Sequence, residues 1–231
     1  MRLIAIALSP AILLVWFLYV RGRPSQPLPR RLVAVLFVLG GLSAGLALVL
    51  NHLVEKYTLF WSGAPEFAHR LGFWFLGIGL NEELAKMIVL LAVLYPRRLF
   101  HAPYQGLLGA AAVALGFAAV ENVVYLDRYG TVTLLFRSLL TVPAHAFFSI
   151  PMGVMLAYAK RSRNAAGQYA WLLGALTVAA ALHGGYDLWL SFESDWINRL
   201  AYLQVLLMAA LAWRLMRLEP FRPGPAVEGL R

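Results

Sequence analysis

Seven long apolar segments, separated by short polar stretches, occupy most of the 231-residue chain. Each is about 18 to 25 residues long, the length that an α-helix needs to cross the roughly 30 Å hydrocarbon core of a bilayer. Hydrophobic residues make up 61% of the sequence, and a single globular core could not bury so many of them. The sequence therefore predicts an all-α, polytopic transmembrane helix bundle. The expected spans are 3–20, 31–53, 71–95, 104–126, 139–159, 168–190 and 197–217.

The charged residues indicate how the bundle is oriented. Cations gather in the first, third and fifth loops and near the C-terminus, whereas the other loops are richer in acidic residues. Because positively charged loops stay in the cytoplasm, we predict an N-terminus outside and a C-terminus inside. The net charge of +9 is then explained by topology and by contact with anionic lipid, not by a nucleic-acid partner. The loop cations include Arg21, Arg23, Arg30, Arg31, Arg97, Arg98, Lys160, Arg161, Arg163, Arg214 and Arg217.

Seven spans leave no room for a separate soluble domain. We predict one transmembrane domain over residues 1–219, with a catalytic core at about 70–190, and a disordered, Pro- and Gly-rich tail at 220–231. The first apolar segment is followed by arginines and not by a small-residue cleavage site, so we expect it to be retained as a helix. The chain has no cysteine, which excludes disulfides, thiolate metal ligands and a cysteine nucleophile.

Ionisable side chains interrupt four of the predicted spans. A charged residue in the hydrocarbon core costs at least about 2.5–3.5 kcal/mol, so such residues usually serve a function or pair tightly. At a rise of about 1.5 Å per residue, all of them fall in the outer half of the membrane or near its midplane. Four helices that place ionisable groups in one layer predict a functional site. Its expected members are Glu82, Glu83, Lys86, Glu121, Asn122, His145, His183 and Asp187.

Some of these residues also have a purely structural interpretation. Glu82 and Lys86 are four residues apart and could form an ion pair, but one lysine cannot neutralise two adjacent glutamates. Glu121 could serve only as a hydrogen-bonding residue between helices. Asp187 lies one helical turn after His183, a spacing at which a carboxylate can orient an imidazole or share a ligand role with it.

The residue types suit two ways of hydrolysing an amide bond. In the first, Glu82 or Glu83 activates a water molecule and the histidines stabilise the oxyanion. In the second, a metal ion such as zinc activates the water and a second glutamate acts as the base. The sequence lacks the H-E-x-x-H spacing of the zincins, so the ligands would come from separate helices. The candidate metal ligands are His145, His183, Asp187 and Glu121.

Other functions use similar residues. A transporter or a non-catalytic membrane protein-interaction module remains the alternative, because proton and ion pathways also place carboxylates and histidines in the membrane. Transporters usually contain paired repeats, and none is evident here. Ser149, one turn after His145, lacks the glycine-flanked setting of a nucleophile. The remaining histidines lie near span ends and are expected to be interfacial: His52, His69 and His101.

Four motifs, in the same order, resemble those of the PrsW family of intramembrane proteases. The resemblance covers about residues 70–190. In the related CAAX-prenyl proteases, arginine, phenylalanine and asparagine stand where this chain has Lys86, Thr141 and Asp187, which favours the PrsW family. The motifs are Glu82-Glu83-Leu-Ala-Lys86, Gly116-Phe-Ala-Ala-Val-Glu121-Asn122, His145 and His183-Gly-Gly-Tyr-Asp187.

The resemblance implies an integral membrane endopeptidase in a bacterial or archaeal cell membrane. Its partners would be lipids and a transmembrane protein substrate, such as an anti-sigma factor, cut near the extracytoplasmic side. From the residues themselves we expect a water-accessible site between the third to sixth spans, with zinc as the one candidate cofactor. In this site Lys86 would tune the glutamate pair and Asp187 would orient His183. The resemblance slightly favours Glu82 over Glu83 as the base.

Overall fold

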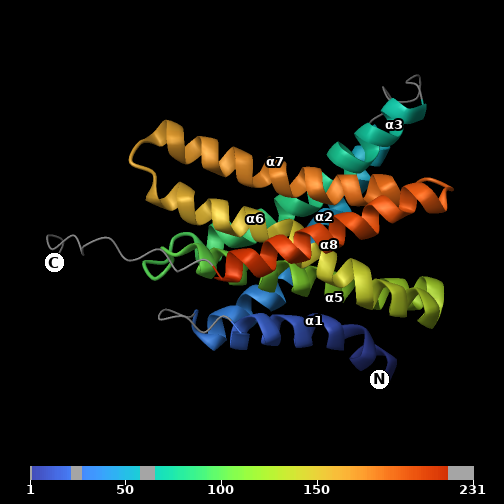
Figure 1. Cartoon of the computed structure of the whole chain (residues 1–231), viewed down its shortest axis with the longest axis horizontal. Coiled ribbons are helices and arrows are strands. Elements are labelled where there is room, and N and C mark those ends of the chain that lie inside the picture. The colour runs from blue at the N-terminus through green and yellow to red at the C-terminus, as the bar shows by residue number, and fades with distance from the viewer. Residues whose placement is uncertain (1, 22–27, 58–65, 218–231) are drawn as a thin grey trace, which may run out of the picture.

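The computed structural model describes residues 2–21, 28–57 and 66–217, which form helices and short connections with no strand among them. The predicted tail at 220–231 lies outside the described residues. In Figure 1, α1 begins and α8 ends at opposite ends of the bundle. The elements in chain order are α1 (Arg2–Arg21), α2 (Arg30–Tyr57), α3 (Glu66–Gly72), the π-helical η2 (Phe73–Gly79), α4 (Leu80–Val89), η3 (Leu90–Leu94), α5 (Pro103–Phe136), η4 (Arg137–Thr141), α6 (Val142–Arg161), α7 (Ala165–Leu190) and α8 (Asp195–Arg217).

The prediction of an all-α membrane bundle is confirmed, and the predicted number of seven spans is approximate. The predicted third span is divided among α3, η2, α4 and η3. It is therefore not among the five described helical stretches that are long and apolar enough to cross a membrane. Those five are Leu3–Val20, Arg30–Lys56, Pro103–Arg161, Ala165–Leu190 and Asp195–Met216.

The longest stretch, Pro103–Arg161, contains the predicted fourth and fifth spans as two arms of a helical hairpin. Gly130 has φ 80° and ψ −172°, a conformation that glycine adopts without strain. The two arms touch backbone to backbone, because a Cβ on Gly106 would lie 1.9 Å from the carbonyl oxygen of Gly153. The charge of Arg137 predicts that segment 127–138 lies in the outer interface, between the fourth and fifth spans. In the structure this segment is helical, since the chain needs only one glycine to reverse.

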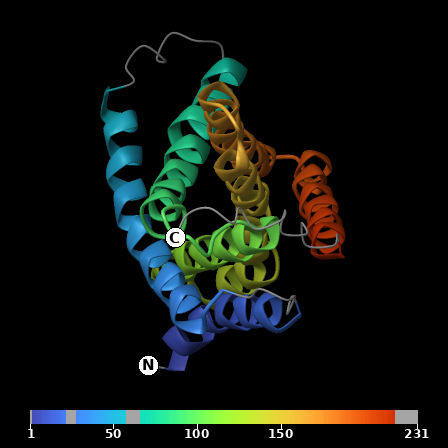
Figure 2. The same ribbon diagram turned by 90° about the vertical axis from the view of Figure 1, so that its left-hand side faces the viewer.

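The first arm of α5 forms the centre of the bundle. Its glycines and alanines are buried, as expected for a span rich in small residues. Their size lets neighbouring helices approach closely: a Cβ on Gly116 would lie 1.8 Å from the carbonyl oxygen of Phe37 in α2. Helices α1, α2 and α6 all pack against α5, and Figure 2 shows α2 and α8 on opposite sides of the bundle.

Two glycines bring the glutamate-bearing helix against α7. A Cβ on Gly79 would lie 2.8 Å from the backbone nitrogen of Gly184, so only glycine permits this approach. The π-helical η2 immediately precedes the glutamates, and such wide turns often occur at functional sites. The Asn81 side chain donates a 2.6 Å hydrogen bond to the carbonyl oxygen of Gly77 within this turn. The backbone contact places Glu82 and Glu83 opposite the histidine of α7.

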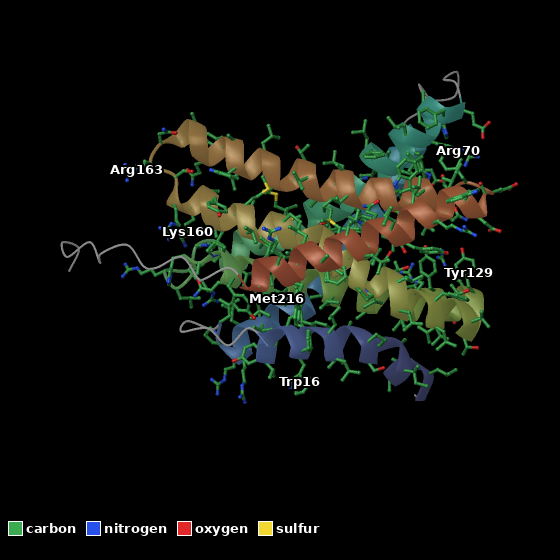
Figure 3. All side chains as sticks on the ribbon, in the orientation of Figure 1. Trp16, Arg70, Tyr129, Lys160, Arg163 and Met216 are labelled. Atoms are coloured by element: carbon green, nitrogen blue, oxygen red, sulfur yellow. The ribbon has the colours of Figure 1, made fainter. Side chains whose placement is uncertain are left out.

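Two of the predicted loops meet at one end of the bundle. Lys160 and Arg163 lie at one end in Figure 3, and Arg70 and Tyr129 lie at the other. The Lys160 ammonium donates hydrogen bonds to the carbonyl oxygens of Tyr95 (2.5 Å) and Arg97 (2.6 Å). The third and fifth predicted loops, both expected in the cytoplasm, therefore lie together.

Candidate active site

The eight residues predicted for the site form one connected cluster among four helices. Helix α4 contributes the glutamate pair and the lysine, α5 a glutamate and an asparagine, α6 one histidine, and α7 a histidine and an aspartate. Contacts of 2.7–3.9 Å join these groups, with Arg137 as an additional member. The members are Glu82, Glu83, Lys86, Glu121, Asn122, His145, His183 and Asp187.

Glu83 is the most completely bonded residue of the cluster. Its Oε1 accepts hydrogen bonds from the Lys86 ammonium (2.7 Å) and from Nδ1 of His183 (2.9 Å), and its Oε2 accepts one from Ser149 (2.7 Å). The side chain is fully buried. Because an ionised carboxylate only accepts hydrogen bonds, we assign the proton of His183 to Nδ1. Nε2 of His183 then carries a free lone pair.

Glu82 is the opposite case. Its Oε2 is the one buried side-chain oxygen or nitrogen in the described part of the chain that has no hydrogen-bond partner. This atom lies 3.6 Å from Nε2 of His183 and 3.9 Å from the Lys86 ammonium. A buried polar atom without a partner requires an explanation, such as a proton, a water molecule or an ion. Glu82 is therefore the carboxylate of the pair that is free to take part in chemistry.

His145 is held from both sides. Its Nε2 lies 2.8 Å from Oε2 of Glu121, and its Nδ1 lies 3.2 Å from the Lys86 ammonium. Each histidine of the cluster thus has one ring nitrogen bonded to a glutamate: Glu121 serves His145, and Glu83 serves His183. Carboxylates in such positions fix the tautomer and the orientation of an imidazole.

Lys86 supplies a buried positive charge at the centre of the cluster. The side chain has no exposed surface, and its ammonium lies 4.2 Å from the centre of the Phe117 ring. The Glu83 ion pair and the face of the ring together compensate the loss of hydration. The lysine therefore pairs closely with Glu83, at 2.7 Å, whereas Glu82, the partner that the four-residue spacing suggested, lies at 3.9 Å.

Arg137 is a site residue that the sequence analysis assigned to the outer interface. Its guanidinium donates to Oε2 of Glu121 (3.0 Å) and to Oδ1 of Asn122 (3.2 Å), and it lies 3.8 Å from the Tyr125 ring. A signal was present in the sequence, because the predicted span 104–126 contains an intramembrane glutamate and no cation, so its partner should come from outside that span. The reversal of the chain at Gly130 brings Arg137 back to Glu121.

The cluster is most open at Asp187 and Glu121. Their side chains are 20% and 21% exposed, whereas that of Glu82 is 8% exposed. Asp187 lies 3.5 Å from Nε2 of His183, on the side of the ring that faces Glu82. The hydrogen bond that orients His183 through Nδ1 comes from Glu83, although the sequence analysis assigned that role to Asp187.

Three residues of the cluster could hold a metal ion. Glu82, His145 and His183 each offer one ligand atom, and these atoms lie within 4.8 Å of one another. Two histidines and a glutamate suit zinc, which binds imidazole nitrogen and carboxylate oxygen. The unpartnered Oε2 of Glu82 and the free Nε2 of His183 fit this use. Glu82 joins the two predicted histidine ligands here, in place of Asp187 and Glu121.

Comparisons with known proteins agree with the resemblance seen in the sequence. The PrsW family, described as intramembrane metalloproteases, matches residues 28–214. Protease PrsW of Bacillus subtilis (strain 168) is 31% identical over 91% of both chains. Protease PrsW of Geobacillus kaustophilus (strain HTA426) is 32% identical over 93% of this chain and 89% of its own. No solved structure matches.

The family match extends over most of the chain and includes every residue of the buried cluster. A bacterial integral membrane location follows from the family and from the apolar helices. The chain is therefore a member of the PrsW family of intramembrane proteases, and its activity is that of a peptidase.

Proposed function

We propose that this peptidase uses one zinc ion, held by Glu82, His145 and His183, to cut a transmembrane protein near the extracytoplasmic side of the membrane. The unpartnered Oε2 of Glu82, which faces Nε2 of His183, carries the proposal. The exposure of Glu121 and Asp187 supports access from the predicted outer side. An anti-sigma-factor-like protein is the substrate class that the family resemblance suggests.

Each residue has a defined task in this proposal. A bound zinc ion would supply the Lewis acid that polarises the scissile carbonyl and activates a water molecule. Glu83 keeps the Nδ1 proton of His183 in place, and Glu121 does the same for Nε2 of His145. Asp187, which is more exposed than Glu82, accepts the proton of the attacking water and passes it to the leaving amine.

One observation favours a second mechanism. The Lys86 ammonium lies 3.2 Å from Nδ1 of His145. Since an ammonium only donates hydrogen bonds, this contact occupies the lone pair that a metal ion would need. In the second mechanism Glu82 itself activates the water, and His145 and His183 stabilise the oxyanion.

The metal content of the detergent-purified protein separates the two mechanisms. Elemental mass spectrometry should find about one zinc per chain in the wild type and in the control His101→Ala. The Glu82→Gln variant and the double variant His145→Ala/His183→Ala should lose it, because three ligands are needed. Metal-free protein that still cleaves a membrane substrate in the presence of a chelator would reject the zinc proposal and leave Glu82 as the base.

Arg137 should act as a positioning residue through Glu121. We expect Arg137→Gln to lower kcat about tenfold, with KM nearly unchanged. This is the low end of the usual 10- to 100-fold effect of losing a partner of a ligand, because Arg137 contacts Glu121 and only Glu121 contacts the ligand His145. Arg137→Lys should keep more activity, because it retains the charge although not the forked geometry. The matched control is Arg128→Gln, an exposed residue on the same hairpin. Steady-state cleavage in proteoliposomes would measure both constants, and wild-type kcat in Arg137→Gln would contradict this role.

A further inference from the structure

A groove of about 640 Å³ lies between α1 and α2, away from the buried cluster. Each helix contributes one stripe of residues at positions i, i+3, i+4, i+7 and i+8, so the groove runs along both helices. Nine of the ten lining residues have an apolar or aromatic side chain, and the tenth is an arginine at one end. The residues are Ile12, Val15, Trp16, Tyr19 and Val20 from α1, and Arg30, Val33, Ala34, Phe37 and Val38 from α2.

The groove exists because α5 holds α1 and α2 separately. On α1, the Tyr104 hydroxyl donates a 2.7 Å hydrogen bond to the carbonyl oxygen of Leu18, and Asn122 donates one of 3.2 Å to that of Ala7. On α2, Gly116 lies against the backbone of Phe37. Each helix is therefore fixed by its contacts with α5.

The length of the groove suits a lipid chain of one leaflet. Arg30 and Val38 are eight residues apart on α2, which corresponds to about 12 Å along the helix axis. One leaflet contributes about half of the roughly 30 Å hydrocarbon core. Trp16 and Val38 are 61% and 60% exposed, and Figure 3 shows Trp16 on the outer face of α1. The groove thus faces the space that lipid occupies around a membrane protein.

Positive charge gathers at one end of the groove. Arg30 and Arg31 are both exposed in the first turn of α2, and the Arg30 guanidinium lies 6.0 Å from the centre of the Tyr19 ring. Cations at a helix N-terminus oppose the helix dipole, so these arginines do not stabilise α2. The same dipole and the guanidinium groups attract a phosphate. A basic pocket between transmembrane helices is a known type of site for anionic lipid headgroups.

We infer that this groove binds one anionic phospholipid, with its phosphate at Arg30 and an acyl chain along the apolar stripes. The orientation of the chain in the membrane requires only that cations lie somewhere in the loop before α2. Binding of a phospholipid headgroup requires, in addition, that a cation lies next to the groove, as Arg30 does. The inference does not depend on the mechanism proposed for the peptidase.

Native mass spectrometry of the full-length, detergent-purified protein tests the inference. The chain would be titrated with phosphatidylglycerol and with phosphatidylcholine carrying the same acyl chains. We expect one phosphatidylglycerol to bind in preference to phosphatidylcholine. Arg30→Gln should weaken that binding about fivefold, since a juxtamembrane arginine contributes about 1 kcal/mol. Ala34→Phe should weaken it by filling the groove, and Arg163→Gln, an exposed control at the same end of the bundle, should leave it unchanged.

Two results would overturn the inference. One is equal binding of the two lipids by the wild type. The other is equal weakening by Arg30→Gln and Arg163→Gln, which would indicate a diffuse attraction to the whole basic end. Thermal unfolding would check that Ala34→Phe is folded. If it is not, Arg30→Gln decides alone, because this exposed side chain lies outside the buried core.

Discussion

We expect Glu82→Gln to abolish cleavage of a membrane substrate, by at least about 10³-fold, while the protein stays folded in the membrane. The reason is that Oε2 of Glu82 has no hydrogen-bond partner in the described residues, so its carboxylate is available to a metal ion or to a water molecule. An amide has neither the charge nor the basicity for either role. Glutamine has the same size, so the packing around the side chain should persist.

The measurement is cleavage of a single-span reporter protein in proteoliposomes. Thermal unfolding of each variant reports whether the fold is kept. His101→Ala serves as the matched control, because His101 lies before α5 and does not belong to the group of Glu82, His145 and His183. This variant should cleave the reporter at the wild-type rate. Cleavage by Glu82→Gln within tenfold of the wild type would exclude Glu82 both as a ligand and as the base.

Lys86→Met should lower the free energy of unfolding by about 3–5 kcal/mol, the usual cost of removing one partner of a buried ion pair. In the native protein the Lys86 and Glu83 side chains are both unexposed and only 2.7 Å apart. The variant therefore leaves the Glu83 carboxylate buried without its cation. The double variant Glu83→Gln/Lys86→Met removes both charges of the pair and should recover most of the loss, because residue 83 then no longer places a carboxylate in the core without its cation.

Reversible unfolding in mixed micelles, with increasing denaturing detergent, would measure these differences. Lys56→Met, an exposed lysine at the end of α2, is the matched control and should lower stability by less than about 1 kcal/mol, because an exposed cation in the last turn of a helix contributes no more than that. If the single and double variants are equally stable, Lys86 does not act by neutralising Glu83, and a purely catalytic role for the lysine would remain.

The hairpin illustrates which boundaries the sequence could predict. Both arms were expected as spans from their hydrophobicity alone, yet the stretch from Asp127 to Ser138 was assigned to the interface because of Arg137. Hydropathy averages over a window and cannot show that Arg137 turns inward to Glu121 at 3.0 Å. The direction of a side chain depends on the rotation of the whole helix, which the contacts along both arms determine.

The partners of the two histidines show the same limit. Spacing of four residues within α7 made Asp187 the expected partner of His183. Asp187 does lie 3.5 Å from Nε2 of His183. The hydrogen bond at Nδ1, however, is made with Glu83, 100 residues earlier in the chain, because the close contact of Gly79 with Gly184 brings α4 to that face of α7. Sequence spacing can identify neighbours on one helix, but not neighbours across two helices.

Hydropathy and the positions of the ionisable residues were enough to predict a membrane helix bundle and the eight polar residues proposed for its site. Both conclusions rest on local cost: long apolar segments belong in lipid, and ionisable residues within them must have a use or a partner. How these polar groups are paired is visible only in the packing of the helices. Among the described residues, Oε2 of Glu82 has no hydrogen-bond partner, both oxygens of Glu83 accept hydrogen bonds, and Arg137 contacts Glu121. These pairings depend on distances of a few ångströms between helices, which the order of residues does not contain.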